Sequence, residues 1–308
     1  METHKLIIIG SGPAGLTAAI YAARAGLNPV MFAGLTFGGQ LMITTEVENF
    51  PGFEAGVQGP ELMQKMIQQA ERFGTKIIYE DVTRVDFSHK PFTVWADKQE
   101  YSSESVIIAT GASSLWLGLP SEERLRGKGV SACATCDGFF FKDKDIIVVG
   151  GGDSAMEEAL YLTKFVKSIK LLNRSAKLRA SQIMQSRVLA NSKIEVLYNT
   201  AVAEFVGEDH LTGVRIKDTV SGAVSDLAVG GAFIAIGHKP NTEIFRGQIE
   251  LDDKGYIVPS DQTKTSVPGV FVAGDVRDFR YRQAVTAAGM GCMAALDAEK
   301  HLHMDESK

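Results

Sequence analysis

The sequence is poor in cysteine, in positive charge and in long apolar runs, and each shortage excludes a class of protein. Its 308 residues contain only three cysteines, too few for a disulfide-stabilised secreted scaffold. The 32 Lys and Arg residues are outnumbered by 37 Asp and Glu, and this net charge of −5 argues against nucleic acid or an anionic membrane as main partner. No apolar stretch is long enough to span a membrane. A soluble cytoplasmic protein with room for two domains is therefore expected.

Targeting and metal sites are expected to be absent as well. The apolar run Leu6–Ile9 ends at a glycine turn too early for a secretory signal peptide. A zinc site is disfavoured because there is one Cys-x-x-Cys and no second well-spaced ligand pair. The remaining cysteine, Cys292, lies in a small apolar segment that we interpret as a buried helix with an inert thiol.

The two other cysteines, Cys133 and Cys136, are separated by two residues and followed directly by Asp137. One turn of backbone can bring both sulfurs to the same side, so the pair can close a disulfide and open it again. The neighbouring acid could move the proton that each half of the exchange requires, or stabilise the start of a helix, and the two roles are compatible. A redox pair is favoured over two small buried hydrophobic residues.

Glycine, by contrast, is abundant, and it gathers at two nucleotide-binding fingerprints. In the first, a strand at Lys5–Ile9 leads into Gly10-Ser11-Gly12-Pro13-Ala14-Gly15 and a helix to Arg24, and a second strand follows at Pro29–Ala33. Such a turn lets the pyrophosphate of a dinucleotide approach the free N–H groups of the helix. The acid expected after the second strand for NAD is absent, which leaves FAD open.

The second fingerprint, Gly150-Gly151-Gly152-Asp153-Ser154-Ala155, stands between a strand at Ile146–Val149 and a helix at Met156–Lys164. The next strand, Ser168–Leu172, ends in a loop that carries Arg174, Lys177 and Arg179. Cations at this place suit the 2′-phosphate of NADP, although a solvated basic loop is the plain alternative.

The order of these segments predicts an α/β fold with two Rossmann-like, three-layer ββα dinucleotide-binding domains, the second inserted in the first. A β-meander is expected within Val202–Val229, and the first unit resumes with a strand that ends at Gly274-Asp275 and a helix from Gln283 to Leu302. The expected domains are an FAD-binding domain formed by 1–112 and 244–308, and an NADPH-binding domain at 113–243 that carries the cysteine pair.

Short stretches spread over nearly the whole chain resemble the low-molecular-weight, bacterial-type thioredoxin reductases, which are class II pyridine nucleotide-disulfide oxidoreductases. They are Gly10–Gly15, Gly38–Leu41, Thr44–Gly52, Ala109–Ala112, Val130–Gly138, Ala235–Thr242, Ala273–Asp275 and Tyr281–Ala284. Their common order and spacing carry the resemblance, because each stretch alone is only suggestive.

The resemblance implies two cofactors, FAD and NADPH. The residues implied for FAD are Gly10, Gly12, Pro13, Ala14, Gly15, Ala33, Gly34, Gly39, Gln40, Asn49, Val82, Ala109, Thr110, Gly111, Gly274, Asp275, Arg282, Gln283 and Ala284. Those implied for NADPH are Gly151, Gly152, Asp153, Ser154, Arg174, Arg179, Ile236 and Gly237.

The resemblance also implies a reaction and its partners. Hydride would pass from NADPH to FAD and on to the Cys133–Cys136 disulfide, with Cys136 facing the flavin. Cys133 would attack the disulfide of thioredoxin, with Asp137 as acid/base. The family's habit implies a homodimer and two domains that rotate about hinges near 112–116 and 240–244. A glutaredoxin-like or peroxidase-linked disulfide substrate, a redox sensor without turnover, and a ferredoxin-linked flavin reductase are the competing hypotheses.

One departure concerns the second cofactor. The family commonly shows His-Arg-Arg, three further residues and Arg after the second strand of this domain, and this chain has Asn173-Arg174-Ser175 and then Arg179. One charge-assisted contact to phosphate is therefore missing, at a cost of about 1.5–3 kcal/mol. Lys177 could compensate, and no acid favours NAD instead, so NADPH is still expected.

Overall fold

The computed structural model describes residues 3–44 and 46–306, so Thr45, within the stretch Thr44–Gly52, lies outside the described residues. The chain divides into two compact units, one formed by 1–113 and 239–308 and the other by 114–238. In the described part of the chain, no helix is both long and apolar enough to cross a membrane.

The first unit is built on a seven-stranded sheet with the order β5-β2-β1-β8-β7-β6, and β19 also pairs with β8. Strands β1, β2, β5, β8 and β19 run parallel, whereas the β6–β7 hairpin joins β8 in antiparallel fashion. The bounds are β1 (Thr3–Ile9), β2 (Val30–Phe32), β5 (Lys76–Ile78), β6 (Val82–Asp86), β7 (Phe92–Ala96), β8 (Gln99–Ile108) and β19 (Val270–Val272).

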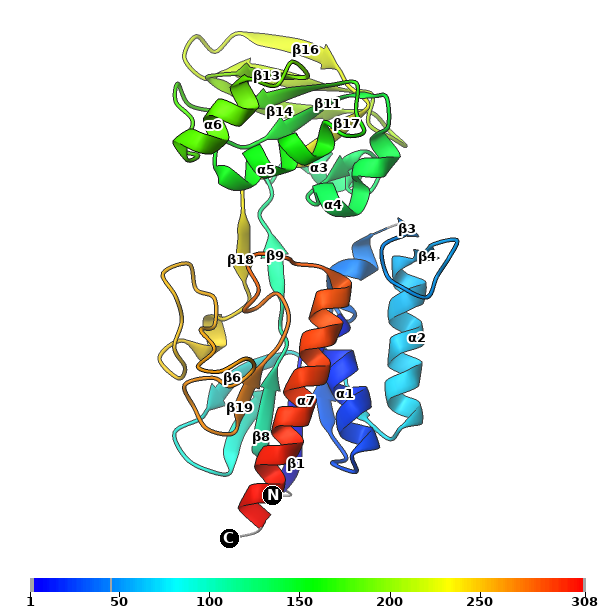
Figure 1. The fold of residues 1–308 in the computed structure, drawn as a ribbon, viewed down its shortest axis with the longest axis vertical. Coiled ribbons are helices and arrows are strands. Elements are labelled where there is room, and N and C mark those ends of the chain that lie inside the picture. The colour runs from blue at the N-terminus through cyan, green and yellow to red at the C-terminus, as the bar shows by residue number, and fades with distance from the viewer. Residues whose placement is uncertain (1–2, 45, 307–308) are drawn as a thin grey trace. The chain divides into compact units, whose positions relative to one another are not determined.

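Alternating side chains of β1 enter the two cores of this unit. Leu6 and Ile8 pack among helices α1 (Pro13–Arg24), α2 (Gly59–Arg72) and α7 (Ala284–Glu306), whereas Ile7 and Ile9 join a cluster on the opposite face. Figure 1 shows α7 alongside α1, and α1 also packs against α2. The ends of β1, β8 and β19 therefore lie next to the first turn of α1, where the first glycine loop is placed.

Short elements complete the first unit. They are η1 (Gly39–Ile43), β3 (Glu46–Val47), β4 (Val57–Gln58) and η3 (Glu243–Phe245). The two chain segments that lead into and out of the other unit pair as a two-stranded ladder of β9 (Ala112–Ser114) and β18 (His238–Pro240).

The second unit has three layers. A parallel five-stranded sheet of order β10-β17-β11-β12-β13 is covered on one face by α5 and α6, and β14, β15 and β16 form an antiparallel sheet that packs on the other. The bounds are α3 (Pro120–Leu125), β10 (Val130–Ser131), α4 (Ala134–Asp137), η2 (Gly138–Phe141), β11 (Asp145–Val149), α5 (Asp153–Leu162), β12 (Ser168–Leu172), α6 (Gln182–Leu189), β13 (Ile194–Leu197), β14 (Thr200–Val206), β15 (Gly213–Asp218), β16 (Val224–Ala228) and β17 (Gly231–Ile234).

The β-meander expected within Val202–Val229 is confirmed, and three other expectations need correction. Helices α1 and α5 begin within the fingerprints, several residues before the expected starts at Leu16 and Met156. The sequence predicts a strand only at Ser105–Ala109, whereas β8 already begins at Gln99 because its first half pairs with β7. Cys292 is partly exposed instead of buried.

Candidate active site and nucleotide-binding loops

The redox pair forms a disulfide within one short turn. Cys133 precedes α4 and Cys136 lies in it, and their Cα atoms are 5.3 Å apart. The turn closes with a hydrogen bond from the N–H of Asp137 to the carbonyl of Cys133, at 3.1 Å. Cys136 is exposed and Cys133 is partly exposed, so a disulfide partner can reach the pair.

Small residues allow the disulfide turn to pack closely against α5 and the residues that follow it. Ala134 is buried, and a Cβ added to Gly138 would lie 2.9 Å from the Leu162 side chain and 3.5 Å from Phe165. A larger residue at either place would lift the turn from the helix. Small residues within and after the Cys-x-x-Cys motif thus hold its backbone against the core and leave the sulfurs at the surface.

Asp137 is the acidic side chain that follows the disulfide turn. Its carboxylate Oδ2 accepts a hydrogen bond of 2.5 Å from the hydroxyl of Ser131. Burial raises the pKa of Asp137 above its ordinary value, and the Ser131 hydrogen bond opposes that rise. Ser131 was not among the residues predicted for this site; its place two residues before Cys133 is the signal that the sequence offers.

The first glycine loop has the shape that a dinucleotide requires. A Cβ on Gly10 would lie 2.3 Å from the carbonyl oxygen of Ala109, and one on Gly15 would lie 1.9 Å from that of Gly10. Gly10 also has a φ of +110°. A Cβ on Gly12, in contrast, would meet nothing within 4 Å, so it would occupy the space in front of α1. These glycines keep that approach clear for a phosphate group.

Ser11 fastens the loop after β2 to the fingerprint. Its hydroxyl donates to the carbonyl of Ala33 at 2.7 Å and accepts from the N–H of Gly38 at 2.9 Å. A Cβ on Gly39 would come within 3.4 Å of Gly12. The segment from Ala33 to Gln40 is thereby folded back over the glycine loop.

Distant segments of the first unit meet around this loop. Asn49 donates to the side chain of Gln283 at 3.3 Å, and Asn241 exchanges hydrogen bonds with Thr110, at 2.8 Å in each direction. A Cβ on Gly274 would lie 2.9 Å from that of Ala14. Ala109 lies next to Gly10, and a Cβ on Gly34 would lie close to the side chain of Asp81. Val82 is the first residue of β6. No role was predicted for Asn241 or Ser11, because their contacts join segments that are far apart in the chain.

Two acids follow β19. Burial and the nearby charge of Asp278 raise the pKa of Asp275 to about 7, although Arg282 acts in the opposite direction. Asp278 itself is buried and accepts backbone hydrogen bonds from Arg280, Tyr281 and Arg282. It fixes the segment that leads to Gln283 and Ala284, and the sequence offered no sign of this beyond its acidic character.

The second glycine loop repeats the design of the first. A Cβ on Gly150 would lie 2.4 Å from the carbonyl oxygen of Ala235, just before Ile236 and Gly237, whereas one on Gly152 would meet nothing within 4 Å. Asp153 accepts from the N–H and hydroxyl of Ser181, at 2.9 and 2.8 Å. Its carboxylate therefore ties α5 to the loop before α6, with Ser154 next to it in the first turn of α5.

The loop after β12 presents three exposed cations on a fixed backbone. Arg174, Lys177 and Arg179 are exposed, whereas Asn173 is buried. The Asn173 amide donates to the carbonyls of Ser175 at 2.6 Å and Lys177 at 3.1 Å. The Arg179 N–H donates to the Gly151 carbonyl at 2.7 Å. The loop is thus held beside the second fingerprint, and its three cations suit a phosphate group.

A chain with two glycine loops that open helices and a disulfide in one short turn also matches a known family model over most of its length. The model is described as pyridine nucleotide-disulphide oxidoreductase, and it matches residues 4–291. The chain belongs to this family of oxidoreductases.

Whole-chain relatives agree with this assignment. The thioredoxin reductase of Mycolicibacterium smegmatis is 56% identical over 97% of this chain and 96% of that protein, and that of Rickettsia conorii is 55% identical over 98% and 99%. The solved thioredoxin reductase from Giardia duodenalis has a TM-score of 0.94 at 43% identity, over 98% of this chain and all of that one. The resemblance and the fold of two dinucleotide-binding domains are confirmed.

FAD and NADPH are the cofactors of this oxidoreductase. The residues present fit both groups. Gly12 and Gly152 leave space before α1 and α5 that a Cβ would fill, and the loop after β12 offers cations for the added phosphate of NADPH.

Proposed function

We propose that this enzyme reduces the disulfide of thioredoxin with electrons from NADPH, which pass through FAD and the Cys133–Cys136 pair. The observation that carries the proposal is the accessible disulfide turn with Asp137 held in its hydrogen-bond network, in a chain whose relatives are thioredoxin reductases. When bound, FAD would supply the two-electron redox chemistry that links NADPH to the disulfide.

The two units would divide the cofactors. FAD would lie on the unit that contains the first fingerprint, expected at 1–112 and 244–308, and NADPH on the inserted unit, expected at 113–243. The glycine loops, the contacts of Asn49 and Asn241, and the buried turn at Asp275 support the first assignment. The cations beside the second glycine loop support the other.

The two sulfurs would have different tasks. Cys136 would receive the electrons from FAD, and Cys133 would attack the disulfide of the substrate and form a mixed disulfide with it. Cys136 would then attack Cys133, which restores the internal disulfide and releases the reduced substrate. Asp137, with its raised pKa, would hold and return the protons of these steps.

A substitution at Cys133 tests these roles. In the Cys133→Ser variant, NADPH should still bleach the flavin in an anaerobic titration, because FAD reduction does not need this sulfur. Turnover of oxidised thioredoxin should be lost. A variant that reduces thioredoxin at the parent rate contradicts the assignment. Parent enzyme that reduces glutaredoxin but not thioredoxin assigns the same chemistry to another substrate.

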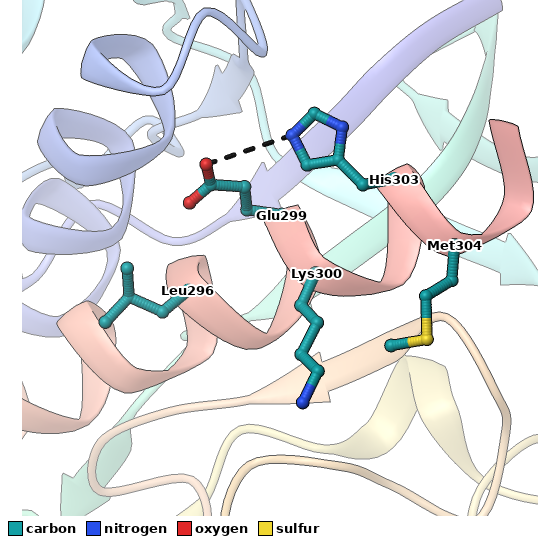
Figure 2. A pocket seen from close by; sticks show the side chains of 5 residues that line it. All are labelled: Leu296, Glu299, Lys300, His303 and Met304. Carbon is teal, nitrogen blue, oxygen red and sulfur yellow. Dashed lines mark ion pairs between the residues drawn. The ribbon is translucent and has the colours of Figure 1, made fainter. Parts of the chain in front are cut away.

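We also propose that the enzyme is a cytoplasmic homodimer that associates through its first unit. Apolar side chains of α1 and α7 support this: Tyr21, Val285, Met293, Leu296 and Met304 are at least 38% exposed. Figure 2 shows Leu296, Lys300 and Met304 around an open depression on α7, beside the His303–Glu299 pair. Apolar side chains of this kind form the core of subunit interfaces, with polar and charged side chains at the rim.

Sedimentation velocity tests the proposed dimer. Leu296→Glu should shift the enzyme from dimer to monomer, because it places a charge in the proposed interface. Ile183→Glu, at an exposed apolar position on α6 outside the proposed interface, is the control and should leave the dimer intact. A parent enzyme that sediments as a monomer, or a Leu296→Glu variant that stays dimeric, rejects this interface.

A further inference from the structure

The hydroxyl of Ser131 connects the acid of the redox turn with the backbone of its first cysteine. Ser131 ends β10, is 6% exposed and is held in place by parallel pairing with Phe233 of β17. Its Oγ accepts a hydrogen bond from the N–H of Cys133 at 3.0 Å and donates one to Oδ2 of Asp137 at 2.5 Å. The carbonyl of Cys133 lies 3.5 Å away, and the single hydroxyl proton goes to the nearer carboxylate.

A purely local role for Ser131 accounts for only part of this arrangement. A serine that accepts from the N–H two residues later forms a common turn, and that bond alone would stabilise the chain before α4. The additional bond to Asp137 spans the whole redox turn and fixes the orientation of its carboxylate. In the described part of the chain, no other hydrogen bond to this carboxylate is made, so Oδ1 stays available to exchange a proton.

We propose that Ser131 is a positioning residue for thiol–disulfide exchange, which anchors one carboxylate oxygen of Asp137 so that the other carries the proton. The inference rests on the proposed function, because it assigns a task to the acid of the same site. Its structural basis is the geometry of one buried hydroxyl between two members of the turn.

The proton balance of the exchange shows what this anchoring does. The reduced turn begins with Cys133 as a thiolate, Cys136 as a thiol and the Asp137 carboxyl protonated at Oδ1. When Cys133 forms the mixed disulfide, the first substrate sulfur leaves as a thiolate and takes the proton of Asp137. The carboxylate then accepts the Cys136 proton while Cys136 attacks Cys133, and it passes that proton to the second leaving sulfur. Two protons and two electrons thus reach the substrate disulfide.

The hydrogen bond from Ser131 is the specific interaction that changes the pKa of the Asp137 carboxyl group. Burial raises the pKa of Asp137 and the bond from Ser131 lowers it, without a contribution from a charged neighbour. η2 carries no ionisable side chain. The ionisable groups of the turn and of α5, which packs against it, are Cys133, Cys136, Asp153, Glu157, Glu158 and Tyr161.

The test is the pH dependence of a single turnover of the reduced holoenzyme with oxidised thioredoxin. In Ser131→Ala, loss of the bond to the ionised carboxylate should move the alkaline limb of the rate profile up by about one pH unit. The maximal rate should fall about tenfold, with the thioredoxin concentration for half-maximal rate unchanged. Ser131→Thr, which keeps the hydroxyl, should restore the parent profile.

Three outcomes separate the possible failures. If the parent does not exchange with thioredoxin at any pH, the proposed function fails. If the parent exchanges and Ser131→Ala keeps both the limb and the rate, Ser131 has no positioning role. If Ser131→Ala loses its FAD or its fold, the comparison passes to Ser131→Gly, which also lacks the hydroxyl and should show the same shift of the limb. A Gly variant with the parent profile would overturn the proposal.

Discussion

The buried carboxyl of Asp275 should make the flavin-free protein less stable as the pH rises. The pKa of this group is raised from 3.8 to about 7 by burial and by Asp278. Between these two values the folded chain keeps a proton that the unfolded chain releases. The stabilising contribution of this group is therefore fully present below about pH 4. It decreases as the pH rises toward 7 and is lost above that pH. Asp275→Asn keeps the shape and removes the charge.

The size of the effect follows from the shift. About three pKa units at 1.36 kcal/mol each give a ceiling of about 4 kcal/mol. Part of the Asp275 side chain is exposed to water, which weakens the effect. We therefore expect Asp275→Asn to increase the free energy of unfolding at pH 8 by about half of that value. For a unit of this size, about 2 kcal/mol corresponds to a Tm increase of roughly 4–8 °C.

Calorimetry of the flavin-free parent and variant at pH 5, 6.5 and 8 measures this directly. The Tm difference should grow with pH. Asp278→Asn is the contrasting variant: it should lower the Tm at every pH, because its carboxylate holds three backbone N–H groups. The reasoning is refuted if Asp275→Asn is no more stable than the parent at pH 8, or if its advantage is the same at pH 5.

Three further outcomes are expected. Gly291→Ala should destabilise the protein by about 1–3 kcal/mol in urea unfolding, because its Cβ would lie 2.1 Å from the carbonyl oxygen of Ala14. Gly289→Ala on the same helix, whose Cβ would meet nothing within 4 Å, should stabilise the protein slightly. Equal unfolding midpoints of the two variants would contradict this. Arg179→Ala should weaken NADP⁺ binding about 10- to 100-fold in calorimetric titration and leave NAD⁺ binding unchanged, and a loss shared by both would exclude a phosphate contact. Asn173→Ala should weaken NADP⁺ binding less than Arg179→Ala does, because it loosens the loop without removing a cation; unaltered affinity would show that the amide does not position the loop.

Much of this site could be predicted from the sequence, because its main parts are local. The spacing of Cys133 and Cys136 limits the pair to one turn. The glycines at 10, 12 and 15 encode a tight turn at the start of a helix. Short elements such as α6 and β13 were not predicted, because a segment of four to eight residues is too short to show a clear periodic pattern and acquires its conformation from the sheet on which it packs.

The sequence by itself determined the two nucleotide loops, the redox turn and the α/β class, since each depends on residues close together in the chain. Only the tertiary structure decided which side chains support them. The bond between Asn49 and Gln283, the seating of Gly291 on Ala14, and the link from Ser131 to Asp137 depend on how strands and helices pack. Such contacts leave no periodic pattern, because a hydrogen bond or a close approach requires position in space and not spacing along the chain.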